Sequence, residues 1–146
     1  MGKLLALSAK AGVAYAVTVF AIGFLLGTVR VLLLAPRVGP TVAVSIETPI
    51  ILTASWYASR FWVTRLGLDA EIRLRILVGV VAFVTLMTLE VALSIGLFHR
   101  SIGEYLADLR SPAGAIGLAA QICFATFPLL DAVVHRRPTQ SGRRLV

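Results

Sequence analysis

Four long apolar runs alternate with short polar segments along the chain. The runs cover residues 11–35, 41–63, 76–98 and 112–130. Each meets the roughly 20 residues that a helix needs to cross a hydrocarbon core about 30 Å thick. Pro36 favours the end of the first helix, and Gly39 and Pro40 favour the beginning of a second. The first two runs should therefore form a tight antiparallel hairpin. The pattern predicts an all-α fold, a four-helix transmembrane bundle within a single domain of residues 1–134.

The segment between the third and fourth runs predicts a further, short helix. Ser101-Ile102-Gly103-Glu104 matches a capping box, and apolar residues recur at helical spacing beyond it. We expect an amphipathic helix on the outer membrane surface. Ser111 and Pro112 suit the N-cap and the first residue of the last span. Residues 135–146 are polar and basic, and we expect them to form a cytoplasmic tail.

Composition and charge support a membrane protein. Hydrophobic residues make up 58% of the 146 and charged residues only 14%, against about a quarter charged in a soluble domain. The single cysteine excludes a disulfide within the chain. The net charge of +7 does not favour nucleic-acid binding, because the basic residues cluster between and after the apolar runs, where topology signals occur.

The distribution of Lys and Arg predicts the orientation. Ten would lie on one side of the membrane: Lys3, Lys10, Arg60, Arg65, Arg73, Arg75, Arg136, Arg137, Arg143 and Arg144. Three would lie on the other: Arg37, Arg100 and Arg110. This asymmetry predicts a protein of a bacterial cytoplasmic (inner) membrane with both termini inside. The expected partners are the lipid bilayer and, through the basic loops and tail, anionic lipid headgroups.

Three ionisable residues, Arg30, Glu47 and Glu90, interrupt the apolar runs. A charge near the bilayer centre costs a few kcal/mol or more, so such residues usually face the bundle interior and pair. At 1.5 Å per residue, all three lie about 9–12 Å below the outer ends of their spans. We therefore predict one buried polar cluster in the outer half of the bilayer. It could serve as a structural ion pair, an ion or proton pathway, or a lipid or ligand site, and Arg30 could instead snorkel outward.

Small and polar residues around these charges are predicted to pack the helices. Gly23 and Gly27 form a GxxxG pair on the face of Arg30, which allows close helix approach. Pro49 can loosen the backbone hydrogen bonds beside Glu47. Such small-residue seams favour helix packing over a pore lining. Three secondary polar residues accompany them: Gln121, Ser94 and Thr48.

The first hairpin resembles an uncharacterised family of small four-span bacterial membrane proteins. The resemblance rests on Gly27-Thr28-Val29-Arg30-Val31-Leu32-Leu33-Leu34-Ala35-Pro36-Arg37, followed by Ile46-Glu47-Thr48-Pro49. In that family an R-V-L…P-R hairpin precedes a span that carries Glu-x-Pro. The resemblance implies no activity, and it singles out Arg30, Glu47 and Pro49 for testing.

Catalytic and metal-binding patterns are missing from the sequence. His99 and His135 fall on opposite sides of the membrane, and a surface metal site from His99, Glu104 and Asp108 is not favoured because no ligand spacing repeats. There is no catalytic triad, P-loop or dinucleotide fingerprint. We expect no enzymatic activity, no cofactor and no metal.

The function we expect is a small structural or accessory membrane component, present as a homo-oligomer or in a larger membrane complex. The alternative is a small oligomeric transporter or ion/proton pathway that uses the intramembrane carboxylates. A third possibility, an intramembrane enzyme or lipid-binding protein, rests on the external amphipathic helix.

Overall fold

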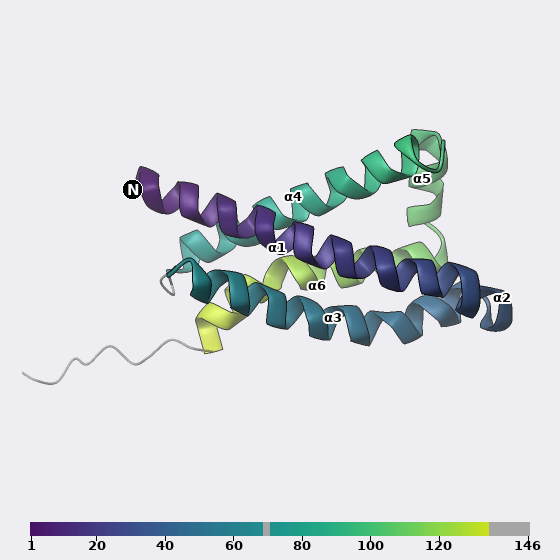
Figure 1. Ribbon diagram of the computed structural model, residues 1–146, viewed down its shortest axis with the longest axis horizontal. Helices are drawn as coiled ribbons and strands as arrows, with labels where there is room; N and C mark the ends of the chain where they lie inside the picture. Colours follow the sequence, from purple (N-terminus) through teal and green to yellow (C-terminus); the bar gives the residue numbers. More distant parts are fainter. Residues whose placement is uncertain (69–70, 135–146) are drawn as a thin grey trace, which may run out of the picture.

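The described part of the chain, residues 1–68 and 71–134 of a computed structural model, is built from helices and contains no strand (Figure 1). The elements are α1 (Gly2–Val29), the π-helical segment η1 (Arg30–Leu34), α2 (Ala35–Val38), α3 (Pro40–Arg65), α4 (Ile72–Gly96), α5 (Ile102–Leu109) and α6 (Pro112–Val134). The predicted all-α class is confirmed. Three helical stretches are long and apolar enough to cross a membrane: Gly2–Val38, Ile72–Gly96 and Pro112–Val134. The predicted tail at 135–146 lies outside the described residues.

The sequence predicted that the first helix ends at Pro36, and this prediction is wrong. The first hairpin turns at Gly39. The helix continues through Pro36 to Val38, and the wide π turn of η1 lies directly before it. Proline has no backbone N–H and its ring collides with the preceding turn, so a widened turn at this place lets the helix continue past it. Gly39 then adopts φ +83°, a conformation that glycine takes without steric cost. Pro40 begins α3 immediately afterwards.

The capping predictions for the last two helices are confirmed. The Ser101 hydroxyl accepts a hydrogen bond from the Glu104 backbone N–H, and the Glu104 carboxylate accepts one from the Ser101 backbone N–H. At the start of α6, the Gly114 backbone N–H donates to the Ser111 hydroxyl over 3.0 Å. These side chains satisfy N–H groups that the first helical turn leaves free.

The best-packed part of the bundle lies around Tyr15 of α1. Its ring stacks on Phe124 of α6 with centroids 4.3 Å apart, and alanines fill the adjoining positions on α1 and α4. The backbones of neighbouring long helices approach closely at Gly12 and Gly79. A Cβ on Gly12 would lie 2.7 Å from the Val78 carbonyl oxygen, and one on Gly79 would collide with the Ala125 carbonyl oxygen.

The glycine pair predicted to mark close approach does not do so. A Cβ on Gly23 would meet the end of the Ile51 side chain at an ordinary 3.8 Å, and one on Gly27 would meet only Arg30 of its own helix. The GxxxG spacing is therefore present without a backbone packed against it. The close contact instead involves isolated glycines of α1 and α4, which no local spacing motif marks.

Many large apolar side chains of the bundle point outward. Side chains on all four long helices are strongly exposed, and on α3 they form one stripe along the helix: Val42, Ile46, Ile50, Tyr57 and Phe61. The buried positions of the same helix are Ala43, Ser55, Ser59 and Val63. On α3, mostly small and polar residues are buried beneath a large apolar exterior, which is the opposite of a helix in a soluble domain and suits a lipid environment.

Candidate functional site

The structure pairs Arg30 with Glu47, as the sequence predicted. Arg30 opens the π segment η1, and its Nε lies 2.5 Å from the Glu47 Oε2 on α3. The contact is an ion pair, not a well-aligned hydrogen bond. The Arg30 side chain is 29% exposed and that of Glu47 16%. Arg30 thus ties the two arms of the first hairpin while part of it stays accessible from outside the bundle.

Glu90 lies in a separate contact. The Gln121 side-chain amide of α6 donates from Nε2 to both Glu90 carboxylate oxygens, each over 2.7 Å. Within residues 1–68 and 71–134, no hydrogen bond or ion pair joins Glu90 to Arg30 or Glu47. The predicted intramembrane residues therefore form two polar contacts, one between α3 and the end of the first helix and one between α4 and α6.

Three buried polar atoms on α4, α5 and α6 have no hydrogen-bond partner: Ser94 Oγ, Tyr105 Oη and Gln121 Oε1. Ser94 lies one helical turn beyond Glu90, and its residue is only 7% exposed. The Tyr105 hydroxyl interacts with the Glu90 carboxylate but makes no well-aligned hydrogen bond. Burial raises the pKa of Tyr105, so this hydroxyl keeps its proton.

The other predicted polar residues of α3 are satisfied within their own helix. The Thr48 hydroxyl donates to the Val44 carbonyl oxygen over 2.8 Å. Pro49 lies inside α3, which continues on both sides of it, and its own carbonyl accepts from the Thr53 hydroxyl over 2.7 Å. Neither residue joins α3 to another helix by a hydrogen bond.

A third charged pair was not predicted. Arg75 Nη1 at the beginning of α4 lies 3.1 Å from Asp131 Oδ2 near the end of α6, and the two side chains are 6% and 7% exposed. Arg75 Nη2 also donates to the Leu68 carbonyl oxygen over 3.3 Å. The charge pattern predicts Arg75 only as one of ten basic residues on the cytoplasmic side, and it does not single out Asp131. The signal that could have revealed the pair is topological: when two successive spans run antiparallel, the beginning of the first lies beside the end of the second.

Two neutral cross-helix hydrogen bonds were also missed. Tyr15 donates from its hydroxyl to the Phe124 carbonyl oxygen over 3.0 Å. Trp62 of α3 donates from Nε1 to the Thr18 hydroxyl of α1 over 2.9 Å. The sequence carries no local signal that the indole of Trp62 faces a neighbouring helix.

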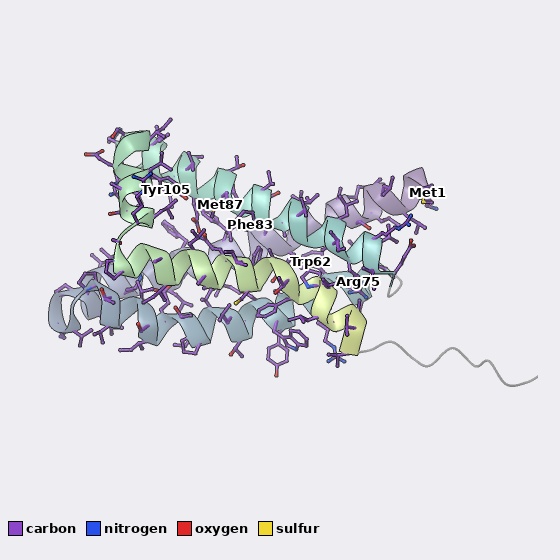
Figure 2. All side chains as sticks on the ribbon, turned by 180° about the vertical axis from the view of Figure 1, so that it is seen from behind. Met1, Trp62, Arg75, Phe83, Met87 and Tyr105 are labelled. Carbon is purple, nitrogen blue, oxygen red and sulfur yellow. The ribbon has the colours of Figure 1, made fainter. Side chains whose placement is uncertain are left out.

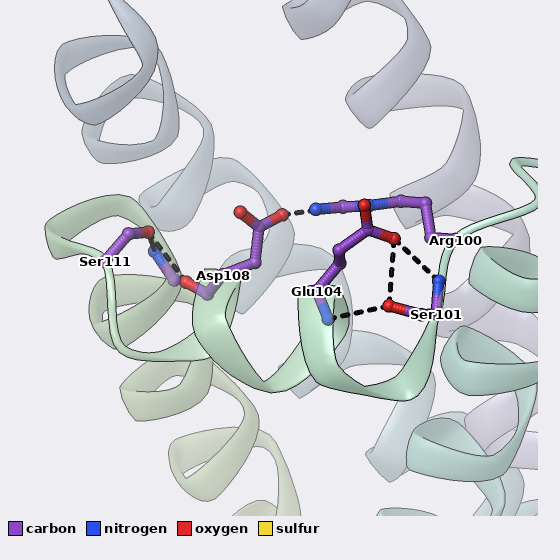
Figure 3. A network of polar contacts seen from close by, with 6 residues as sticks. Arg100, Ser101, Glu104, Asp108 and Ser111 are labelled. Carbon is purple, nitrogen blue, oxygen red and sulfur yellow. Dashed lines mark hydrogen bonds and ion pairs between the residues drawn. The ribbon is translucent and has the colours of Figure 1, made fainter.

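The short helix α5 carries its own surface network (Figure 3). Arg100 Nη1 lies 2.6 Å from Asp108 Oδ2, which clamps the two ends of α5. Hydrogen bonds from the Ser101 backbone and hydroxyl lower the pKa of Glu104. Among the described residues, no group of three or more His, Cys, Asp or Glu side chains could hold a metal ion.

Comparison with known proteins adds no relative: no family model matches the chain, and no curated protein or solved structure is significantly similar to it. The resemblance to small four-span bacterial proteins stays a prediction.

Proposed function

We propose that this protein is a four-span structural or accessory component of a bacterial cytoplasmic membrane, without enzymatic activity. The observation that carries the proposal is the use of its intramembrane polar side chains. Arg30–Glu47 joins the first helical stretch to α3, while Arg75–Asp131 and Glu90–Gln121 join α4 to α6. Polar groups that bridge helices within lipid fix which helices pair and in which register.

The fourth span in this proposal is α3, whose hydroxyl residues lower its hydropathy. Its 26 residues extend for about 39 Å at 1.5 Å per residue, enough to cross a bilayer. Five of its hydroxyls donate to carbonyls one turn earlier, from Ser45, Thr48, Thr53, Ser55 and Thr64. A hydroxyl bonded to its own helix presents little polarity to lipid. The outward apolar stripe of α3 supports the same placement.

Cysteine accessibility tests the four spans and the orientation. Single cysteines at Ser101, Thr41 and Arg65, in a Cys123→Ser background, are labelled in intact cells with a membrane-impermeant maleimide. We expect labelling at Ser101 and Thr41 from outside, and at Arg65 only after the cells are opened. Labelling of Arg65→Cys in intact cells would exclude α3 as a span in this orientation.

A double-mutant cycle tests the pairing role. Arg30→Leu and Glu47→Leu should each lower the free energy of unfolding in detergent, and the double variant should recover part of the loss. We expect a coupling energy of about 1 kcal/mol. Arg37→Leu is the matched control, because Arg37 donates only to the Leu33 carbonyl oxygen of its own helix, and its effect should add to that of Glu47→Leu. Additive losses for Arg30 and Glu47 would argue against a pairing role.

The accessory role implies association with other chains or with anionic lipids. Native mass spectrometry after gentle extraction should reveal a homo-oligomer or a defined complex, with anionic lipids retained by the basic segments. A monomer without bound lipid, recovered under conditions that preserve known membrane complexes, would contradict this part of the proposal.

An ion or proton pathway is the second candidate, and Glu90 is the observation that favours it, because its contacts are neutral side chains. In this case Glu90→Gln should abolish a pH-dependent flux in proteoliposomes while leaving the fold intact. Equal flux through wild type, Glu47→Gln and Glu90→Gln would eliminate this candidate.

A further inference from the structure

Among the described residues, three carboxylates lie within the long helices, and Glu90 alone of them has no basic partner. Arg30 is matched by Glu47 and Arg75 by Asp131, whereas the contacts of Glu90 are the Gln121 amide and the Tyr105 hydroxyl. A carboxylate taken into an apolar environment without a counter-charge is very costly, and it ordinarily becomes neutral. The Glu90 site, which we define as Glu90, Ser94, Tyr105 and Gln121, thus requires one positive charge.

The groups around the site come from each neighbouring element. Helix α6 presents the neutral Gln121 and α5 presents Tyr105. The two carboxylates of α5 are engaged on its surface, Asp108 with Arg100 and Glu104 with Ser101, both of which precede the helix. The Arg30 guanidinium, at the end of the first helical stretch, is engaged with Glu47. Within the described part of the chain, no cationic side chain reaches Glu90.

We propose that the Glu90 site binds a proton, which enters from the α5 side of the bundle. The proton comes from a hydronium ion and forms an O–H bond on one Glu90 oxygen, leaving water; no electrons are transferred. The neutral acid then has an O–H donor for Gln121 Oε1, an atom that now lacks a partner, while the amide Nε2 keeps its bond to the other oxygen. An acid and a carboxamide joined in this way satisfy each other's donors and acceptors.

The position of the unpartnered hydroxyls indicates the side of entry. Ser94 follows Glu90 by one turn in the direction of α5, and Tyr105 belongs to α5 itself. Both hydroxyl oxygens are buried and make no well-aligned hydrogen bond, so each can relay a proton toward Glu90. In the opposite direction, Met87 and Phe83 precede Glu90 on the same face of α4, and Figure 2 shows them in line with Tyr105 between α4 and α6. The apolar side therefore blocks water, and the α5 side admits it.

Infrared spectroscopy of the full-length protein in lipid nanodiscs tests the bound proton. A buried protonated carboxylic acid has a carbonyl stretching band that is separate from those of carboxylates and amides. We expect this band at neutral pH in wild type and in the control variant Glu47→Gln, and its complete loss in Glu90→Gln. If folded wild-type protein lacks the band, or if Glu90→Gln retains it, the proposal is wrong.

Exchange into heavy water tests the route. The acid band shifts when deuterium replaces the proton, and we expect the shift to become severalfold slower in Tyr105→Phe and Ser94→Ala. Tyr57→Phe is the matched control, because Tyr57 is strongly exposed on α3, and it should exchange at the wild-type rate. Equal rates in all four proteins would refute entry from the α5 side.

Competition by sodium separates a proton from a metal cation as the occupant. The acid band is titrated against pH in sodium chloride and in choline chloride. Identical titrations are expected for a proton site. A tenfold or larger displacement of the midpoint proton concentration by sodium would show that an alkali cation occupies the oxygen cluster and would overturn the proposal. These results do not depend on the Arg30–Glu47 coupling, so either proposal can fail alone.

Discussion

The two halves of this bundle differ in what fills them. The packed half comprises α1 up to Phe20, the chain from Ile51 of α3 to Leu68, α4 up to Leu86 and α6 from Phe124, with nearly all the buried residues of the described chain. The polar half comprises the remainder with α2 and α5, and its buried residues are Ala43 and Ser94. In Figure 1, α4 crosses α1 and then diverges from it toward α5. Close packing is thus concentrated at one end of the bundle.

The charged pairs follow the same division. In the packed half, Arg75 and Asp131 are enclosed almost completely. In the polar half, Arg30 and Glu47 are partly accessible, and Glu90 has only neutral contacts. The comparison teaches that the packed half provides stability, whereas the polar half holds the groups that can change protonation or partner. Residues that carry out a changeable function are generally found where packing is less complete.

The largest expected difference in the free energy of unfolding is between variants of the two ion pairs. Asp131→Leu removes the carboxylate that lies 3.1 Å from the buried Arg75 guanidinium. Removing one member of such a buried pair costs about 3–5 kcal/mol. Glu47→Leu should cost about 1 kcal/mol or less, because Arg30 can turn toward water or headgroups. Unfolding in mixed detergent micelles measures both losses. Equal losses would remove the distinction between the halves.

Glycine substitutions in the two halves should give the next largest difference in the free energy of unfolding. Gly79→Ala places a methyl group against the Ala125 carbonyl oxygen, a backbone atom that cannot rotate away. We expect a loss of about 1–3 kcal/mol, the usual cost of overpacking. Gly23→Ala meets only the end of the Ile51 side chain and should be neutral, or stabilising by up to about 1 kcal/mol because alanine favours helix. The same unfolding assay compares them. A neutral Gly79→Ala variant would show that the helices can separate at little cost.

The sequence predicted the features that depend on neighbouring residues. The pairing of Arg30 with Glu47 follows from a short turn between two antiparallel runs, and α5 follows from its capping box, because both are local. Arg75–Asp131 joins residues 56 apart in the chain, and a basic residue at the end of a span looks like a topology signal. The Gly79–Ala125 contact could not be predicted either, because it depends on which faces α4 and α6 turn toward each other.

A different reason explains why the sequence did not predict the π segment. Sequence rules treat proline as the end of a helix, and the helix here passes Pro36 by widening the turn that begins at Arg30. Whether a helix stops or widens depends on the packing around it. The Arg30 side chain starts from this widened turn, so the geometry of the Glu47 pair also depended on tertiary structure.

The smallest expected effect concerns α5, which closes the polar half through local contacts. Ser101→Ala removes the hydroxyl that accepts from the Glu104 backbone over 3.2 Å. Loss of such a cap costs about 1 kcal/mol, so amide hydrogen exchange in α5 should accelerate about fivefold. Exchange in α4 and α6 of the packed half should not change. An unchanged rate in α5 would mean that contacts with α6, and not its cap, hold this helix.

The same helix should respond to acid. The folded pKa of Glu104 lies below its ordinary value because the carboxylate accepts hydrogen bonds from Ser101. The carboxylate therefore contributes its stability in full at neutral pH and loses it as the pH falls through the lowered pKa. Exchange in α5 should accelerate in that range while the packed half stays protected. Glu104→Gln serves as the control, because a glutamine also completes a capping box and does not titrate. If acid accelerated exchange equally in this variant, the response would come from a group other than Glu104.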